Sequence, residues 1–227
     1  MLGRVLEPEV MDSAEEAREY DAMDHAEVNA AFCTDLLAVG PVQGRALDVG
    51  TGTALIPIAL CARATVDVVA IDLAEHMLAL GRTNVTRAGL DGRISLEKID
   101  AKEMPWPDGT FDACISNSIV HHIPNPEAAL REMWRVTRRG GTFFVRDLVR
   151  PTSERDLEAF VTRYGNPLPN AKLDARAIEN QRQSFRASLY AALTLDEVSS
   201  IMRALGMTGL TLALTSDRHW TLAGLKP

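Results

Sequence analysis

Three carboxylates in the first half of the chain stand at or near the ends of short apolar runs. Asp48 precedes a turn that contains Gly50 and Gly52, while Asp72 and Asp100 end runs rich in branched apolar residues. Glycines let a ligand approach the backbone of a turn closely, and carboxylates accept hydrogen bonds from hydroxyl or amino groups. If the runs are parallel strands, their carboxyl ends meet at one edge of the sheet. The spacing therefore predicts a nucleotide-like cofactor at that edge.

The glycine turn leaves two cofactor classes open. A dinucleotide fingerprint would have a third glycine at position 55, which is Leu55 here, whereas the methyltransferase form would have it at 54, which is Ala54. Ala54 is the milder departure, because it adds only a methyl group. The Asp48 carboxylate would repel a pyrophosphate but suits the α-ammonium group of S-adenosylmethionine. The turn favours S-adenosylmethionine, with a nicotinamide dinucleotide as the alternative.

Two adjacent histidines are the sharpest catalytic candidates. His121 and His122 follow Asn117 by four and five residues. A neutral imidazole can accept a proton from a methyl acceptor or orient it, although capping or packing is an equally open role for either ring. Adjacent histidines alone are weak grounds for a metal site. We therefore expect His121, His122 and Asn117 to act in catalysis, and no metal.

The elements that must position these residues alternate along the chain. Strands are predicted from Ala46 onward and at Val66–Ile71, Ile94–Ile99, Phe111–Ser116, Thr142–Val145, Leu210–Leu214 and Trp220–Leu225. Helices are predicted at 12–38 with a break near Tyr20, and at 55–60, 74–88, 126–136, 153–163, 174–192 and 194–205. Gly140-Gly141 and residues 165–170 are expected to form a turn and a loop. Strands that alternate with helices indicate a parallel sheet with right-handed crossovers, and the closing hairpin is foreign to most dehydrogenase domains.

The whole pattern resembles a class I S-adenosylmethionine-dependent methyltransferase of the methyltransferase-11/25-like group. The resemblance rests on the glycine motif at 46–54, Asp72, Asp100-Ala101, the fourth-strand motif at 111–118 and the stretch 130–143, where Arg139 replaces a common proline. It implies one α/β domain with a Rossmann-like, doubly wound, seven-stranded mixed sheet that ends in an antiparallel hairpin. It also implies a helical lid (1–43), a cofactor-binding core (44–150), a helical insert or cover before strand six (151–206) and the closing hairpin (207–227).

The resemblance assigns roles to the cofactor residues. Asp72 is expected to bind both ribose hydroxyls, with a helix cap as the alternative, and Asp100 to bind the adenine amino group. Leu73 or Met77 would form an apolar wall, unless they belong to the core. The full set of expected cofactor-binding residues is Asp48, Gly50, Thr51, Gly52, Asp72, Leu73, Met77, Asp100, Ala101, Asn117 and Ser118.

The acceptor is less well specified. In the family, inserts before strand six often form the acceptor pocket, and the helical pattern 174–192 brings Arg186 and Tyr190 to one face. Tyr20 and His25 could close the site from the lid, and Arg146 stands at a strand end. The alternatives are an ion pair for Arg146, a solvated helix face for Arg186 and Tyr190, and simple packing for Tyr20 and His25. We expect a small, polar or anionic acceptor with Arg186 as its anchor.

Composition narrows the partners. The chain has 227 residues, a net charge of −7 and three widely spaced cysteines. An acidic protein is a poor general binder of nucleic acid, and unpaired buried thiols suit a reducing compartment. The sequence indicates no signal peptide or membrane span, so we expect a cytoplasmic protein without membrane partners, either monomer or homodimer. A cofactor-binding scaffold, non-methyl chemistry and a tRNA or protein acceptor remain as alternatives.

Overall fold

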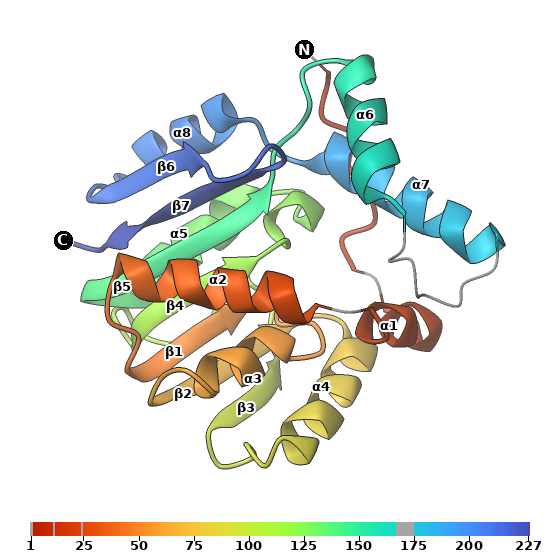
Figure 1. The fold of residues 1–227 in the computed structure, drawn as a ribbon. Helices are drawn as coiled ribbons and strands as arrows, with labels where there is room; N and C mark the ends of the chain where they lie inside the picture. Colours follow the sequence, from red (N-terminus) through yellow and green to blue (C-terminus); the bar gives the residue numbers. More distant parts are fainter. Residues whose placement is uncertain (1, 11, 24, 167–174) are drawn as a thin grey trace.

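The computed structural model describes residues 2–10, 12–23, 25–166 and 175–227. Its seven strands form one sheet in the order β3-β2-β1-β4-β5-β7-β6 (Figure 1). The strands are β1 (Gly44–Val49), β2 (Val66–Asp72), β3 (Ile94–Lys98), β4 (Phe111–Asn117), β5 (Thr137–Leu148), β6 (Leu210–Leu214) and β7 (His219–Leu225). β7 pairs antiparallel with β5 and β6, while the pairings among β1 to β5 are parallel. The predicted fold class is confirmed.

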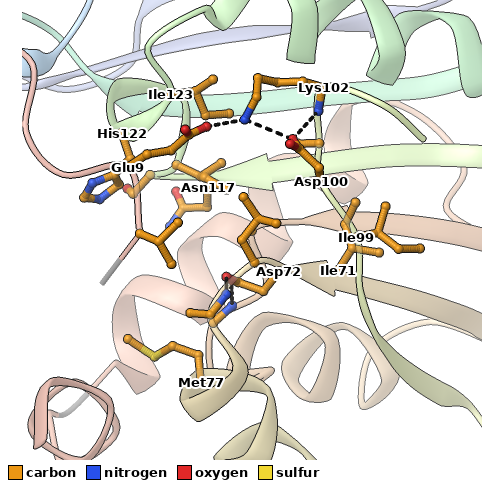
Figure 2. A pocket seen from close by; sticks show the side chains of 18 of the residues that line it. Glu9, Ile71, Asp72, Met77, Ile99, Asp100, Lys102, Asn117, His122 and Ile123 are labelled. Atoms are coloured by element: carbon orange, nitrogen blue, oxygen red, sulfur yellow. Dashed lines mark hydrogen bonds and ion pairs between the residues drawn. The ribbon is translucent and has the colours of Figure 1, made fainter. Parts of the chain in front are cut away.

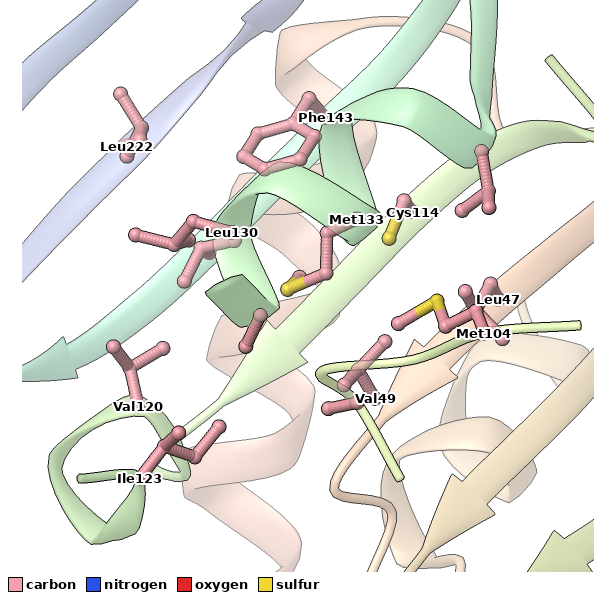
Figure 3. Packing of buried hydrophobic residues seen from close by; sticks show 14 of the residues in the cluster. Leu47, Val49, Met104, Cys114, Val120, Ile123, Leu130, Met133, Phe143 and Leu222 are labelled. Carbon is pink, nitrogen blue, oxygen red and sulfur yellow. The ribbon is translucent and has the colours of Figure 1, made fainter. Parts of the chain in front are cut away.

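Helices cover both faces of the sheet. They are α1 (Ala14–Asp21), α2 (Ala26–Val39), α3 (Leu55–Cys61), α4 (Glu75–Arg87), the 3-10 turn η1 (Val120–His122), α5 (Pro126–Val136), α6 (Glu154–Tyr164), α7 (Ala175–Ala191) and α8 (Leu195–Ala204). α2, α3 and α4 pack on one face, and α5 and α8 pack on the other (Figure 1). On the second face, Leu130 and Met133 of α5 share a buried cluster with Val120 and Ile123 at η1 (Figure 3). The core therefore fixes the turn that carries the paired histidines.

The predicted helical lid is shorter than residues 1–43. Phe32, Cys33 and Leu36 of α2 are fully buried against the sheet. Removing α2 would expose apolar surface worth about 2 kcal/mol for each such side chain. Only the segment up to α1 has the character of a lid, because α1 contacts α4 beyond the edge of the sheet.

The helices after β5 split into two groups. α8 packs beside β6, as part of the layer that covers the sheet. α6 and α7 instead build a separate cluster, in which Leu157 and Leu189 pack with Leu148 at the end of β5. The N-terminal residues run alongside them, where Val5 donates a backbone hydrogen bond to Tyr190 (3.1 Å).

Local signals place most boundaries within a residue or two of the predictions. Ser13 and Thr194 both form capping boxes, with Glu16 and Glu197 respectively. The turn predicted at Gly140-Gly141 is wrong: both residues lie inside β5, where their backbones bond to Lys226 at the end of β7. The loop predicted at 165–170 lies outside the described residues from 167 onward, as does residue 174.

Two compositional expectations can be examined directly. Cys33, Cys61 and Cys114 are buried and unpaired. Across the described parts of the chain, every helix is too short or too polar to cross a membrane.

Candidate active site

A cavity opens where the parallel strands end (Figure 2). It contains about 930 Å³ of space between atoms, part of it open to solvent. One side, the strand-end wall, consists of Gly50, Gly52, Ile71, Asp72, Leu73, Ala74, Met77, Ile99, Asp100, Ala101, Lys102, Asn117 and Ser118. The other side, the lid wall, consists of Glu9, Val10, Tyr20, Ile119, His122 and Ile123. All the predicted cofactor-binding residues except Asp48 and Thr51 line the cavity.

The glycine turn is held from below and from the side. Gly50 adopts a φ of +74° and donates its amide to the Ile71 carbonyl (2.8 Å). A Cβ atom on Gly50 would lie 2.1 Å from Ile119, so this position requires glycine for space as well as conformation. Ala54, where the motif's third glycine would stand, also has a left-handed φ of +64°.

Asp72 accepts hydrogen bonds from backbone amides on both the glycine turn and the start of α4. One carboxylate oxygen accepts the Gly52 amide (2.8 Å) and the other accepts the Ala74 amide (2.9 Å) at the start of α4. Each oxygen retains a second lone pair, and the side chain borders the cavity. Burial raises the pKa of Asp72, although the amides oppose that rise. The turn and the carboxylate are thus fixed relative to each other before any ligand binds.

Asp100 belongs to a charged bridge between the two walls. Lys102 pairs with Asp100 (3.0 Å) and with Glu9 from the N-terminal segment, as Figure 2 shows. The Lys102 amide also donates to Asp100 (2.8 Å). Sequence reasoning missed Glu9 and Lys102, because residues 2–10 have no periodic pattern that would place them near a strand end.

Tyr20 forms the lid wall from α1, as predicted. It borders the cavity next to Gly52. Tyr20 is 38% exposed, but dense packing around it and three nearby carboxylates raise the pKa of Tyr20 to about 12. The phenol is a neutral hydrogen-bond donor at pH 7, as a tyrosine ordinarily is. His25 does not line the cavity; its ring packs against Tyr20 at 4.6 Å and bonds to the Tyr20 carbonyl (2.9 Å).

The two histidines face different surroundings. His122 borders the cavity, and burial lowers its pKa to about 3. His121 is 3% exposed and bonds through Nδ1 to Asp147 (2.5 Å). Burial opposes a charge on His121, but Asp147 outweighs it and holds the histidine pKa above its usual value. His121 does not line the cavity, which contradicts a direct catalytic contact.

Asp48 and Thr51 lie beneath the turn rather than in the cavity. Asp48 is 2% exposed and one of its oxygens has no hydrogen-bond partner. Burial, with a further contribution from Asp72, raises the Asp48 pKa to about 7. The Asp48 carboxylate therefore does not contact a ligand in the cavity directly and can act on it only electrostatically, through the glycine turn.

Arg146 points away from the cavity, contrary to the prediction. Its guanidinium pairs with Asp35 of α2 (2.7 Å) and lies over Phe32 and Phe144. Successive side chains of a strand point to opposite faces, so Asp147 faces His121 while Arg146 faces α2.

Arg186 and Tyr190 also lie outside the cavity. Arg186 forms a two-pronged pair with Glu158 of α6, and the Tyr190 hydroxyl bonds to Glu154 one turn earlier (2.7 Å). The two helices pair their own charges, which spacing within α7 alone does not reveal. Among the described residues, none after Ile123 lines the cavity, so α6 and α7 do not cover it.

Comparison with known proteins agrees with this geometry. The profile of a family described as a methyltransferase domain matches residues 47–145. Residues 47–145 therefore carry the sequence signature of a methyltransferase domain. The matched stretch begins in β1 and ends in β5, so it contains the whole strand-end wall of the cavity.

Individual curated relatives match a little less than half of the chain. Phosphatidylethanolamine N-methyltransferase of Cereibacter sphaeroides is 41% identical over 98 residues, covering 43% of this chain and 47% of the relative. Ubiquinone/menaquinone biosynthesis C-methyltransferase of Geobacter sp. strain M21 is 35% identical over 111 residues, covering 48% and 47%. This chain thus spans about half the length of these curated relatives.

A solved structure extends the likeness in fold to nearly the full chain. A SAM-dependent methyltransferase from Aquifex aeolicus superposes with a TM-score of 0.65 at 18% identity, covering 95% of this chain and 99% of that one. The predicted resemblance to class I S-adenosylmethionine-dependent methyltransferases is confirmed for the domain and the fold.

Proposed function

We propose that this chain is an enzyme that transfers the methyl group of S-adenosylmethionine to a small polar molecule and releases S-adenosylhomocysteine. The observation that carries the proposal is the cavity at the strand ends, which combines a glycine turn with Asp72 and Asp100 on one wall and polar lid residues on the other. The donor suits this wall, which offers carboxylates for hydroxyl and amino groups and glycines where a side chain would intrude.

S-adenosylmethionine supplies a methyl group that is already activated by the sulfonium. The residues of the chain therefore have to bind the cofactor and the acceptor, orient them for methyl transfer and exclude water. Asp72 and Asp100 would hold the ribose and the adenine. Asn117 and Tyr20 would orient the acceptor from opposite walls.

The charges around the cavity favour a neutral or cationic acceptor over an anionic one. Three carboxylates border it, those of Glu9, Asp72 and Asp100, against the single ammonium of Lys102 among the described residues, and that ammonium is paired. Arg186, the anchor expected from the sequence, pairs with Glu158 instead. The names of the relatives include an N- and a C-methyltransferase, so they do not choose the acceptor atom.

His122 contributes to orientation more readily than to proton transfer. An effective general base has a pKa near the working pH, whereas the His122 pKa is about 3. Its unprotonated ring can accept a hydrogen bond from the acceptor. His121 supports the turn from behind.

The proposal is tested by release of S-adenosylhomocysteine from the purified full chain with S-adenosylmethionine and a panel of small amines, phenols and thiols. We expect turnover with at least one small acceptor and a mild dependence on salt. Efficient methylation of tRNA or protein, falling steeply with salt, would contradict the small-molecule acceptor. Cofactor binding without turnover on any substrate would favour a scaffold.

A further inference from the structure

Three potential metal ligands from two distant segments meet behind the lid wall. Glu7 of the N-terminal segment lies against η1, where its Oε1 atom is 3.2 Å from Nδ1 of His122 and 3.8 Å from Nε2 of His121. All three ligand atoms lie within 4.8 Å of one another. The side chains are mostly withdrawn from water, with exposed fractions of 12% for Glu7, 18% for His122 and 4% for His121.

Two of these atoms lack the partner that burial demands. Oε1 of Glu7 and Nδ1 of His122 are buried and make no hydrogen bond. Leaving a buried polar atom unpaired costs about 1–3 kcal/mol, so a pair of them facing each other indicates a missing shared occupant.

The third ligand is already oriented. His121 donates from Nδ1 to Asp147, whose carboxylate also accepts the backbone amide of Leu148 (2.6 Å). This bond places the proton on Nδ1 and leaves Nε2 free on the side that faces Glu7. A carboxylate behind the distal ring nitrogen is the usual support of a metal-binding histidine.

We propose that Glu7, His121 and His122 bind one divalent transition-metal ion, with Zn²⁺ as the expected occupant. Zn²⁺ takes nitrogen and carboxylate ligands at about 2.0–2.2 Å in tetrahedral geometry, which sets its ligands roughly 3.3 Å apart. The Glu7 oxygen lies 3.2 and 3.8 Å from the two ring nitrogens, and all three atoms lie within 4.8 Å of one another, so shifts of roughly an ångström close the site.

The local charge also suits a dication. Glu7 and Asp147 place two carboxylates beside the imidazoles, and a dication would take the place of the proton that these carboxylates favour on His121. Arg4 is the nearby fixed cation, but its guanidinium bonds to the carbonyl oxygens of His121 (3.2 Å) and Ile123 (3.0 Å). These bonds support the backbone of η1, while the charge of Arg4 also acts on Asp147.

The ion would fasten the lid wall. Glu7 lies two residues before Glu9, and His122 borders the cavity itself. A metal ion bound by Glu7 and the two histidines would hold the N-terminal segment against η1. This effect does not depend on which molecule is methylated. The sequence did not reveal this site, because Glu7 is more than a hundred residues from the histidines.

The test uses the chelator-treated full chain, titrated with Zn²⁺ by calorimetry and with Co²⁺ by visible absorbance. We expect one ion per chain, absorbance bands of a four- or five-coordinate Co²⁺ site and a higher melting temperature with Zn²⁺. Glu7→Gln and His122→Ala should each weaken binding by more than about tenfold. His76→Ala is the matched control, since that histidine pairs with Asp12 at the surface (2.9 Å), and it should bind as the wild type does.

Absence of saturable binding to the wild type would overturn the site. So would equal affinity in the wild type and both ligand variants, or loss of binding in His76→Ala. The competing explanation is a proton shared by Glu7 and His122, which predicts no saturable metal binding to the wild type. Circular dichroism and titration with S-adenosylmethionine show whether each variant is folded, and they keep a failure of the metal site distinct from a failure of the proposed function.

Discussion

The two walls of the cavity differ in how the chain builds them. The strand-end wall comes from the ends of neighbouring parallel strands, so its residues are placed by the topology of the sheet. The lid wall comes from the N-terminal segment, α1 and the turn η1, which meet only through tertiary contacts such as those of Arg4 with η1. The first wall suits a constant cofactor, and the second can change with the acceptor without disturbing the sheet.

The largest expected effect is that of Tyr20→Ala, which should impair the acceptor side of the cavity while leaving the cofactor side intact. Loss of this side chain should lower kcat/KM for the acceptor by about 100-fold through lost positioning, with little change in affinity for S-adenosylmethionine. Steady-state kinetics and calorimetry measure the two effects. Tyr164→Ala is the matched control, because that tyrosine bonds to Asp217 far from the cavity. An equal loss of cofactor affinity would show that the walls do not act separately.

The converse experiment is Asp72→Ala. Removal of the carboxylate should weaken binding of S-adenosylmethionine by about 2 kcal/mol, or roughly 30-fold. The melting temperature without ligand should stay close to that of the wild type, apart from the two amide bonds lost in the turn. Asp67→Ala, an exposed residue on the same strand, provides the control. Unchanged cofactor affinity would remove Asp72 from the site.

The same comparison explains which parts were predictable. Apolar runs ending in carboxylates gave the positions of Asp72 and Asp100, because parallel strands end at a common edge. Glu9 and Lys102 were missed, since an ion pair between residues 93 positions apart leaves no local pattern. Arg186 illustrates the reverse case: it lies on the predicted face of α7, but its acidic partner Glu158 stands on α6, which spacing within one helix does not reveal. Helix and strand propensities and capping residues determine where the helices and strands lie. Ion pairs between distant segments decide which charged side chains remain free to bind a ligand.

The affinity of the strand-end wall for S-adenosylmethionine should depend on pH through Asp48. Its carboxyl has a pKa of about 7 in the unliganded protein, and the α-ammonium of S-adenosylmethionine favours the charged form. Binding therefore releases a proton, so affinity should rise severalfold from about pH 6 to about pH 8 and level off above. Asp48→Asn should flatten the profile measured by calorimetry. A wild-type profile that is already flat would show that Asp48 does not sense the ligand.

The smallest effect is expected at the departure from the glycine motif. Ala54 adopts a φ of +64°, which costs an alanine about 1 kcal/mol relative to glycine. Ala54→Gly should change the free energy of unfolding by less than about 0.5 kcal/mol, because relief of the left-handed conformation is offset by the entropy of the more flexible unfolded chain and by loss of a fully buried methyl group. Denaturant melts measure the change, and Ala62→Gly at the other end of α3, where φ is −73°, should be destabilising by about 1 kcal/mol. Equal destabilisation by both would show that no strain resides at Ala54.

The central claim is that the strand-end wall is a site for S-adenosylmethionine rather than for a dinucleotide. The most direct measurement is calorimetric titration of the wild-type chain with S-adenosylmethionine and, in a parallel cell, with NAD. We predict saturable binding of one S-adenosylmethionine per chain and no heat of binding with NAD, because Asp48 lies beneath the turn where a pyrophosphate would rest. Saturable binding of NAD, or none of S-adenosylmethionine, would contradict the account.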